Sequence, residues 1–121
     1  MAAQSPASPM RAMLVGTNTN GTEAGVLTGA THPPVKCDSY PYLTVYVKAT
    51  AALSAGTLVI EERDQPGDVP GTIATITLST PFASAGGTFA YHVTPGAFGY
   101  ISARIGTDAV GGTVIAILRA C

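Results

Sequence analysis

The chain has 121 residues, and its seven acidic and six basic residues leave a formal net charge of −1. A chain of this length is typical of one domain, and a charge near zero does not favour nucleic acid or an anionic membrane as a partner. Only 11% of the residues are charged, against about 25% in an ordinary soluble domain.

Two explanations of the low charge stay open. In the first, other subunits cover much of the surface, because the cores of protein interfaces are poor in charged residues. In the second, hydroxyl side chains of a β-protein rich in Ala, Thr and Gly keep it in solution.

No stretch has the composition of a membrane span or a secretory signal. The longest apolar runs, such as Val114 to Leu118, have the length of a strand, whereas a helix needs about 20 apolar residues to cross a bilayer. Residues 1–13 contain prolines and only a short apolar run, unlike a signal peptide. We expect a chain that is made in the cytoplasm and does not contact a membrane.

The N-terminal third differs from the rest of the chain. Met1 to Pro9 holds Ser, Pro and Ala without periodicity, and the prolines of Thr31 to Pro34 favour extended backbone. Met13 to Thr17 has the composition of one short strand, which as an exposed strand would pair with another subunit's sheet edge. The sequence predicts an extended N-terminal arm over residues 1–35 and a β-domain over residues 36–121.

The strands of the β-domain are predicted from alternation. Leu43, Val45 and Val47 fall on one face of a strand, with Tyr46 and Lys48 on the other. A hydrophilic Pro-Gly loop interrupts the pattern and is expected to be exposed. Strands are expected at Tyr42 to Lys48, Gly56 to Glu62, Thr72 to Leu78 and Thr88 to Val93. The loop is expected at Arg63 to Gly71, between the second and the third of these strands.

The stretch Phe98 to Leu118 alternates more clearly than any other. It predicts two long strands joined by the glycine-rich turn Thr107 to Gly112, that is, a hairpin at the centre of the core. Its second strand is apolar on both faces up to Arg119, since Ile115 and Ile117 alternate with an apolar set. A strand of this kind is buried on both sides or covered by a neighbouring subunit.

No segment predicts a helix, and short strands recur at intervals of roughly 8–15 residues with turn signals between them. The predicted fold class is all-β, an antiparallel β-sandwich of jelly-roll or immunoglobulin-like type. The two cysteines, Cys37 and Cys121, are too few for a disulfide scaffold. They are either a pair that ties the β-domain to the C-terminus or two free thiols.

Residues able to support catalysis are scarce. His32 lies beside two prolines and His92 points outward from a strand, so neither belongs to a metal-binding pattern. A nucleophile pair of Cys37 and His92 has no local support. Glu61, Glu62, Asp64 and Asp68 form either a solvated loop or a cation site, and their spacing matches no calcium loop. We expect no enzyme, no cofactor and no metal.

The order of the segments YLTVYVK, GTLVIEE, the Pro-Gly loop and YISARIGTDAVGGTVIAIL, over about residues 40–119, resembles the small β-sandwich structural proteins of tailed bacteriophage virions. This resemblance implies a non-enzymatic subunit located in the virion. Its partners would be the major capsid protein or other virion subunits, with a homo-oligomer, a trimer among the options, as a further expectation. It transfers no site residue.

Within that class we favour a capsid decoration (cement) protein that binds the assembled head and stabilises it by mass action. A tail, neck or fibre-attachment subunit is the alternative. A carbohydrate-binding or adhesive module is the rival from another class, with Tyr42 and Tyr46 as its stacking surface. The residues predicted to contact other subunits are Met10, Met13, Leu14, Val15, Tyr42, Tyr46, Ile115 and Ile117.

Overall fold

A computed structural model describes residues 10–18, 34–37, 40–93 and 99–121. These residues form strands joined by turns and loops, and they contain no helix that is long and apolar enough to cross a membrane. The strands are β1 (Met10–Asn18), β2 (Val35–Lys36), β3 (Leu43–Ala49), β4 (Ala55–Arg63), β5 (Gly71–Thr77), β6 (Gly87–Val93), β7 (Tyr100–Val110) and β8 (Val114–Ala120).

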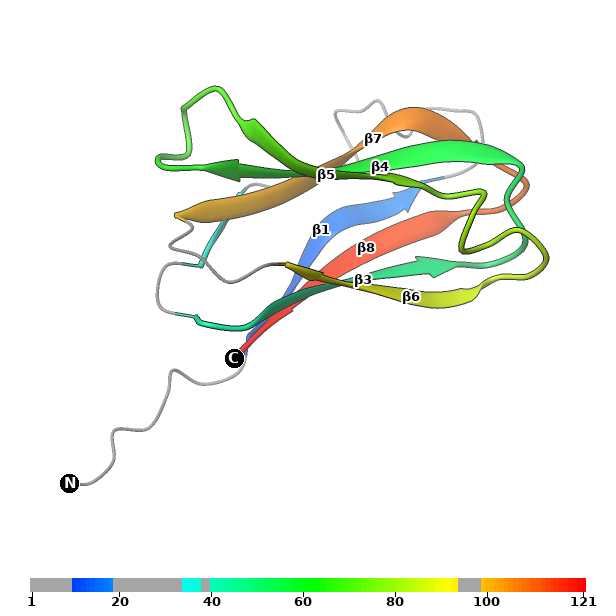
Figure 1. Ribbon diagram of the computed structural model, residues 1–121, viewed down its shortest axis with the longest axis horizontal. Helices are drawn as coiled ribbons and strands as arrows, with labels where there is room; N and C mark the ends of the chain where they lie inside the picture. The colour runs from blue at the N-terminus through cyan, green and yellow to red at the C-terminus, as the bar shows by residue number, and fades with distance from the viewer. Residues whose placement is uncertain (1–9, 19–33, 38–39, 94–98) are drawn as a thin grey trace.

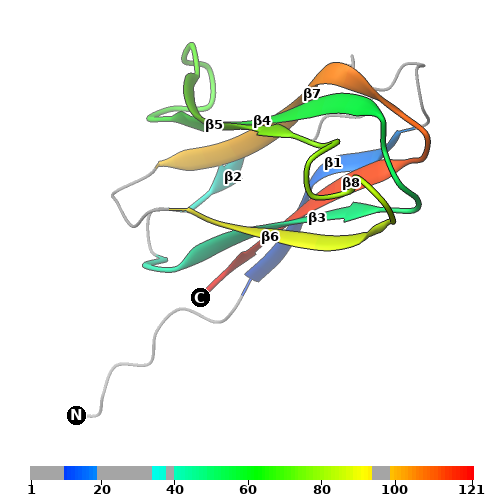
Figure 2. The same ribbon diagram turned by 45° about the vertical axis from the view of Figure 1, so that its right-hand side comes forward.

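The strands make two four-stranded sheets that face one another (Figure 1). The strand order is β1-β8-β3-β6 in one sheet, named here the β8 sheet, and β2-β7-β4-β5 in the other, named the β7 sheet. All of the strand pairs are antiparallel. Figure 2 shows the short strand β2 beside β7.

The pairing of β1 with β8, β2 with β7, β3 with β6 and β4 with β5 is that of a long antiparallel ribbon rolled into two sheets. An eight-stranded double sheet wound in this way is a jelly roll. The predicted all-β antiparallel sandwich is therefore confirmed.

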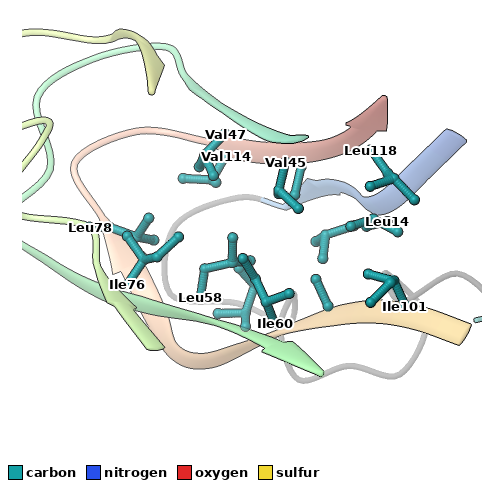
Figure 3. Packing of buried hydrophobic residues seen from close by; sticks show 14 of the residues in the cluster. Leu14, Val45, Val47, Leu58, Ile60, Ile76, Leu78, Ile101, Val114 and Leu118 are labelled. Atoms are coloured by element: carbon teal, nitrogen blue, oxygen red, sulfur yellow. The ribbon is translucent and has the colours of Figure 1, made fainter. Parts of the chain in front are cut away.

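The core lies between the two sheets. Val45 and Val47 of β3 point across to Leu58 and Ile60 of β4, and all four are fully buried (Figure 3). The predicted alternation is confirmed in β3, where Leu43 is also buried and Lys48 is exposed. Burial of one such aliphatic side chain stabilises the fold by about 1.5–3 kcal/mol.

The predicted hairpin over Phe98 to Leu118 is wrong. β7 pairs with β2 and β4 in one sheet, whereas β8 pairs with β1 and β3 in the other, so the two strands face each other across the core (Figure 1). Gly111 makes the crossing possible, because its φ is +114° and a Cβ there would lie 2.6 Å from the Ala52 carbonyl oxygen. Alternation identifies the buried face of a strand but does not identify its partner.

The N-terminal boundary is also corrected. Residues 10–18, predicted within an arm, form β1, an edge strand of the β8 sheet that pairs with this chain's own β8. A register shift between Met13 and Val15 lets the successive residues Leu14 and Val15 both enter the core, where each is 1% exposed. The other predicted arm segments, residues 1–9 and 19–33, lie outside the described residues.

The ends of the sandwich contain the predicted loops. The loop between β4 and β5 is exposed, as expected from its Pro-Gly composition (Figure 1). At the other end the backbone N–H of Leu53 donates to the carbonyl of Phe82 at 2.8 Å, which joins the loops after β3 and β5. Cys37 is buried, Cys121 is exposed, and they form no disulfide.

Candidate functional site

The outer face of the β8 sheet gathers cations around an apolar centre, and we name it the cationic face. Successive side chains of a strand point to opposite sides of its sheet, so the residues that alternate with the core set lie on this face. They are Arg11 and Met13 of β1, Ile115, Ile117 and Arg119 of β8, Thr44, Tyr46 and Lys48 of β3, and Thr88, Ala90 and His92 of β6.

A hollow of about 240 Å³ opens on the cationic face. Ile117 forms its floor, since this side chain faces away from the core and yet is only 2% exposed. The sheet register places Met13 on one side of Ile117 and Tyr46 on the other. The hollow is lined by Arg11, Tyr46, Lys48, Thr88, Ile117 and Arg119.

Within the described part of the chain, the three cations of this hollow have no acidic neighbour on their face. Arg11 lies directly opposite Arg119 in the sheet register, and like charges so placed destabilise a sheet. Among the described residues, no salt bridge involves Arg11, Arg119 or Lys48. The described acidic residues all belong to β4, β7 or the loop after β4. The positive charge is therefore uncompensated within the described part of the chain.

The structure brings four of the predicted contact residues together, namely Met13, Tyr46, Ile115 and Ile117, on the cationic face. Tyr42 is 68% exposed, but it precedes β3 and lies about 13 Å along the strand from Tyr46 at a rise of about 3.3 Å per residue. The two tyrosines therefore do not form one continuous aromatic platform.

The other predicted contact residues belong to the chain's own interior. Leu14 and Val15 are part of the core cluster, and Met10 is partly buried against it. The structure thus removes Leu14 and Val15 from the surface candidates, because the irregular register of β1 turns both of them inward.

The outer face of the β7 sheet contains cations as well, but there they are paired. The guanidinium Nε of Arg104 donates to Glu61 Oε2 at 3.0 Å, and Arg63 Nη2 lies 4.0 Å from Glu61 Oε1. Arg63 Nη1 also donates to the Ser102 hydroxyl at 2.7 Å. Glu61 and Ser102 are 7% and 3% exposed, so the two arginines cover the polar groups that they bind.

The acidic residues near this network do not assemble a metal site. Glu62, Asp64 and Asp68 border a hollow of about 390 Å³ beside the loop after β4. In that loop, Asp68 accepts a hydrogen bond from the backbone N–H of Gln65 at 3.0 Å, as in an exposed turn. No group of three or more His, Cys, Asp or Glu residues that could hold a metal ion occurs in the described ranges.

A Cys–His nucleophile pair is not assembled. Cys37 is buried next to β2, where its thiol donates to the Val35 carbonyl at 3.2 Å. His92 is exposed on β6 of the opposite sheet, and its Nδ1 lies 3.0 Å from the Thr44 hydroxyl. His32 lies outside the described residues.

The sequence interpretation missed the cations. Alternation alone already placed Lys48 on the face of Tyr46 and Arg119 on the face of Ile117. That these residues surround one hollow with Arg11 depends on the pairing of β8 with both β1 and β3, which no local pattern reveals.

No protein-family model and no curated protein matches the sequence. Among solved structures, the chain is similar to the K1 cleaved adhesin domain of the Lys-gingipain of Porphyromonas gingivalis W83. The TM-score is 0.55, the sequence identity is 13%, and the match covers 96% of this chain and 91% of that chain. At this identity the similarity shows a shared β-sandwich fold.

Proposed function

We propose that the chain is a non-enzymatic attachment module of a virion, of the capsid decoration type, and that it binds through the cationic face. The observation that carries the proposal is the hollow of that face, where three cations that form no salt bridge with a described residue surround an apolar floor. Tyr, Met and Arg are enriched at protein interfaces, and Tyr46, Met13 and Arg119 lie together here.

Two further features support this proposal. The segments of the chain resemble small virion β-sandwich proteins in their order, as described above. The jelly roll is also a fold of viral capsid and lectin domains, although a fold by itself does not fix a function. A small protein that binds only the assembled shell lowers the free energy of that shell, and many copies on a lattice multiply this effect.

Imaging of the particles that co-purify with the chain tests the proposal. Cryo-electron microscopy is expected to show the chain outside an icosahedral head at symmetry-related positions, and heads that carry it are expected to withstand heat better than heads without it. Density in the tail or neck would favour the alternative virion subunit. A chain found on no particle would contradict the proposal.

A second candidate is an adhesive module that binds carbohydrate. It is favoured by the lining of the hollow, to which Tyr46 contributes an aromatic side chain and Thr88 a hydroxyl, and by the fold shared with an adhesin domain. This candidate requires sugar binding by the isolated chain. Screening the purified chain on a glycan array therefore separates the two: binding that Tyr46→Ala abolishes supports adhesion, and a silent array removes it.

A further inference from the structure

We infer that the ligand of the cationic face is an acidic protein segment that carries an apolar side chain between its carboxylates. This inference rests on the proposed function, because it names the chemistry of the partner surface. It follows from three properties of the face: its charge, its layout and its apolar floor.

The charge requires an anionic partner. Arg11 and Arg119 lie opposite each other on β1 and β8, and Lys48 lies on β3 across the hollow. All three side chains are exposed. A fold accommodates adjacent cations at a cost to its own stability, and a complementary negative surface removes that cost on binding. The arginines on the β7 sheet show that this chain can also pair its cations internally.

The layout favours carboxylates. An arginine guanidinium binds a carboxylate through two parallel hydrogen bonds, and two neighbouring arginines offer two such sites. Lys48 adds a point charge at the far side of the hollow, next to Thr88. A segment with acidic residues on both sides of a central position would therefore contact Arg11 and Arg119 at one end and Lys48 at the other.

The floor of the hollow favours a protein segment over an acidic polysaccharide. Ile117 lies between Met13 and Tyr46 in the register, and Ile115 continues the apolar strip along β8. Ile117 itself is only 2% exposed. The accessible apolar area therefore comes from its half-buried neighbours Met13, Tyr46 and Ile115. An aliphatic side chain placed over them buries apolar area on both partners, whereas a sulfated sugar would place polar groups against it. The net charge of −1 also argues against a polyanion as the general partner.

Titration of the full, isotope-labelled chain with short peptides tests the inference by NMR. The probe is acetyl-Glu-Glu-Leu-Glu-Glu-amide, and the control peptides replace Glu by Gln or Leu by Gly. We expect amide shifts on β1, β3 and β8 with the probe, and binding at least about tenfold weaker with either control. Shifts confined to the β7 sheet, or equal binding of the Gln peptide, would overturn the inference.

A matched pair of variants sharpens the test. Arg119→Glu and Lys36→Glu change the net charge equally, but Lys36 lies exposed on β2 of the other sheet. Arg119→Glu is expected to weaken peptide binding at least about tenfold and Lys36→Glu less than about twofold. Equal losses would mean that only overall charge matters and would overturn the inference. A heparin oligosaccharide that binds the face more tightly than the peptide would overturn it in favour of an acidic glycan.

The same variants separate this inference from the proposed function. If virion heads carry the wild-type chain and take up Arg119→Glu equally well, the inference fails together with the assignment of the cationic face as the binding surface, whereas the proposed role as a capsid decoration protein stands. If the chain decorates no particle but binds the acidic peptide through the cationic face, the proposed function fails and the inference stands.

Discussion

The two outer faces of the sandwich differ in whether their arginines are paired with a carboxylate. On the β7 sheet, Arg63 and Arg104 surround Glu61, and the carboxylate is nearly buried beneath them. On the β8 sheet, Arg11 and Arg119 face each other, and no described acidic residue lies on that face. Both faces belong to one small domain, so the difference concerns the use of each face and not the composition of the chain.

Paired charges stabilise the chain that contains them, whereas unpaired charges remain available to a partner. In the network on the β7 sheet, the Ser102 hydroxyl and the Glu61 carboxylate each accept a hydrogen bond from an arginine of the same chain. On the cationic face, the two arginines and Lys48 form no salt bridge with a described residue, and they line a hollow whose floor is Ile117. We therefore expect substitutions in the Glu61 network to change mainly the stability of the fold, and substitutions on the cationic face to change mainly the affinity for a partner.

The largest expected effect is on binding. The double variant Arg11→Glu with Arg119→Glu replaces both arginines of the cationic face by residues of opposite charge. We expect its association with virion heads to weaken at least about 100-fold, which corresponds to about 2.7 kcal/mol. Co-sedimentation with heads measures this loss, and undiminished association would remove the cationic face from the binding surface.

The second effect is on stability and belongs to the β7 sheet. Glu61→Ala leaves Arg63 and Arg104 without their carboxylate, so we expect the free energy of unfolding to fall by about 1–2 kcal/mol. Glu62→Ala is the matched control, since no salt bridge involves Glu62 among the described residues, and we expect a change within about 0.5 kcal/mol. Urea unfolding measures both. Equal losses for the two variants would show that the network does not stabilise the fold.

A higher salt concentration is expected to weaken binding through the cationic face more than it changes the stability that the Glu61 network provides. Raising sodium chloride from roughly 50 to 500 mM shortens the screening length severalfold, so we expect binding through the exposed cations to weaken about tenfold. The unfolding midpoint should change little, because Glu61 is shielded by its two arginines. Affinity that does not depend on salt would leave the apolar floor as the main source of binding.

The smallest expected effect is an increase in stability caused by a substitution that weakens binding. Arg119→Glu removes a repulsive pair and places a carboxylate opposite Arg11, so we expect the free energy of unfolding to rise by about 0.2–1 kcal/mol. The variant would bind worse and be more stable. A thermal unfolding scan measures the change, and a clear loss of stability would indicate that Arg119 has a structural role.

Much of the fold could be predicted from the sequence because alternation is a local property. The buried set of β3 and the exposed loop after β4 both follow from it. The pairing of strands is not local, so β7 and β8 resembled a hairpin although they lie in different sheets. Likewise, Leu14 was predicted to contact another subunit but lies in the core, because the register shift between Met13 and Val15 changes which side chains face inward.

The candidate site could be predicted only in part, for the same reason. Tyr46, Ile115, Ile117 and Met13 were identified as apolar surface candidates, and they meet on one face. The cations around them were overlooked, because Arg11 comes from one end of the chain, Arg119 from the other and Lys48 from its middle. Only the assembled sheet shows that they surround one hollow.

The orientation of the chain on its partner tests the central claim most directly. In a cryo-electron microscopy map of heads that carry the chain, we predict that the β8 sheet faces the shell, with Arg11, Arg119 and Lys48 next to acidic side chains of the capsid subunit. The Glu61 network of the β7 sheet should face the solvent. A chain that contacts the shell through its β7 sheet, with the cationic face exposed to solvent, would contradict the claim.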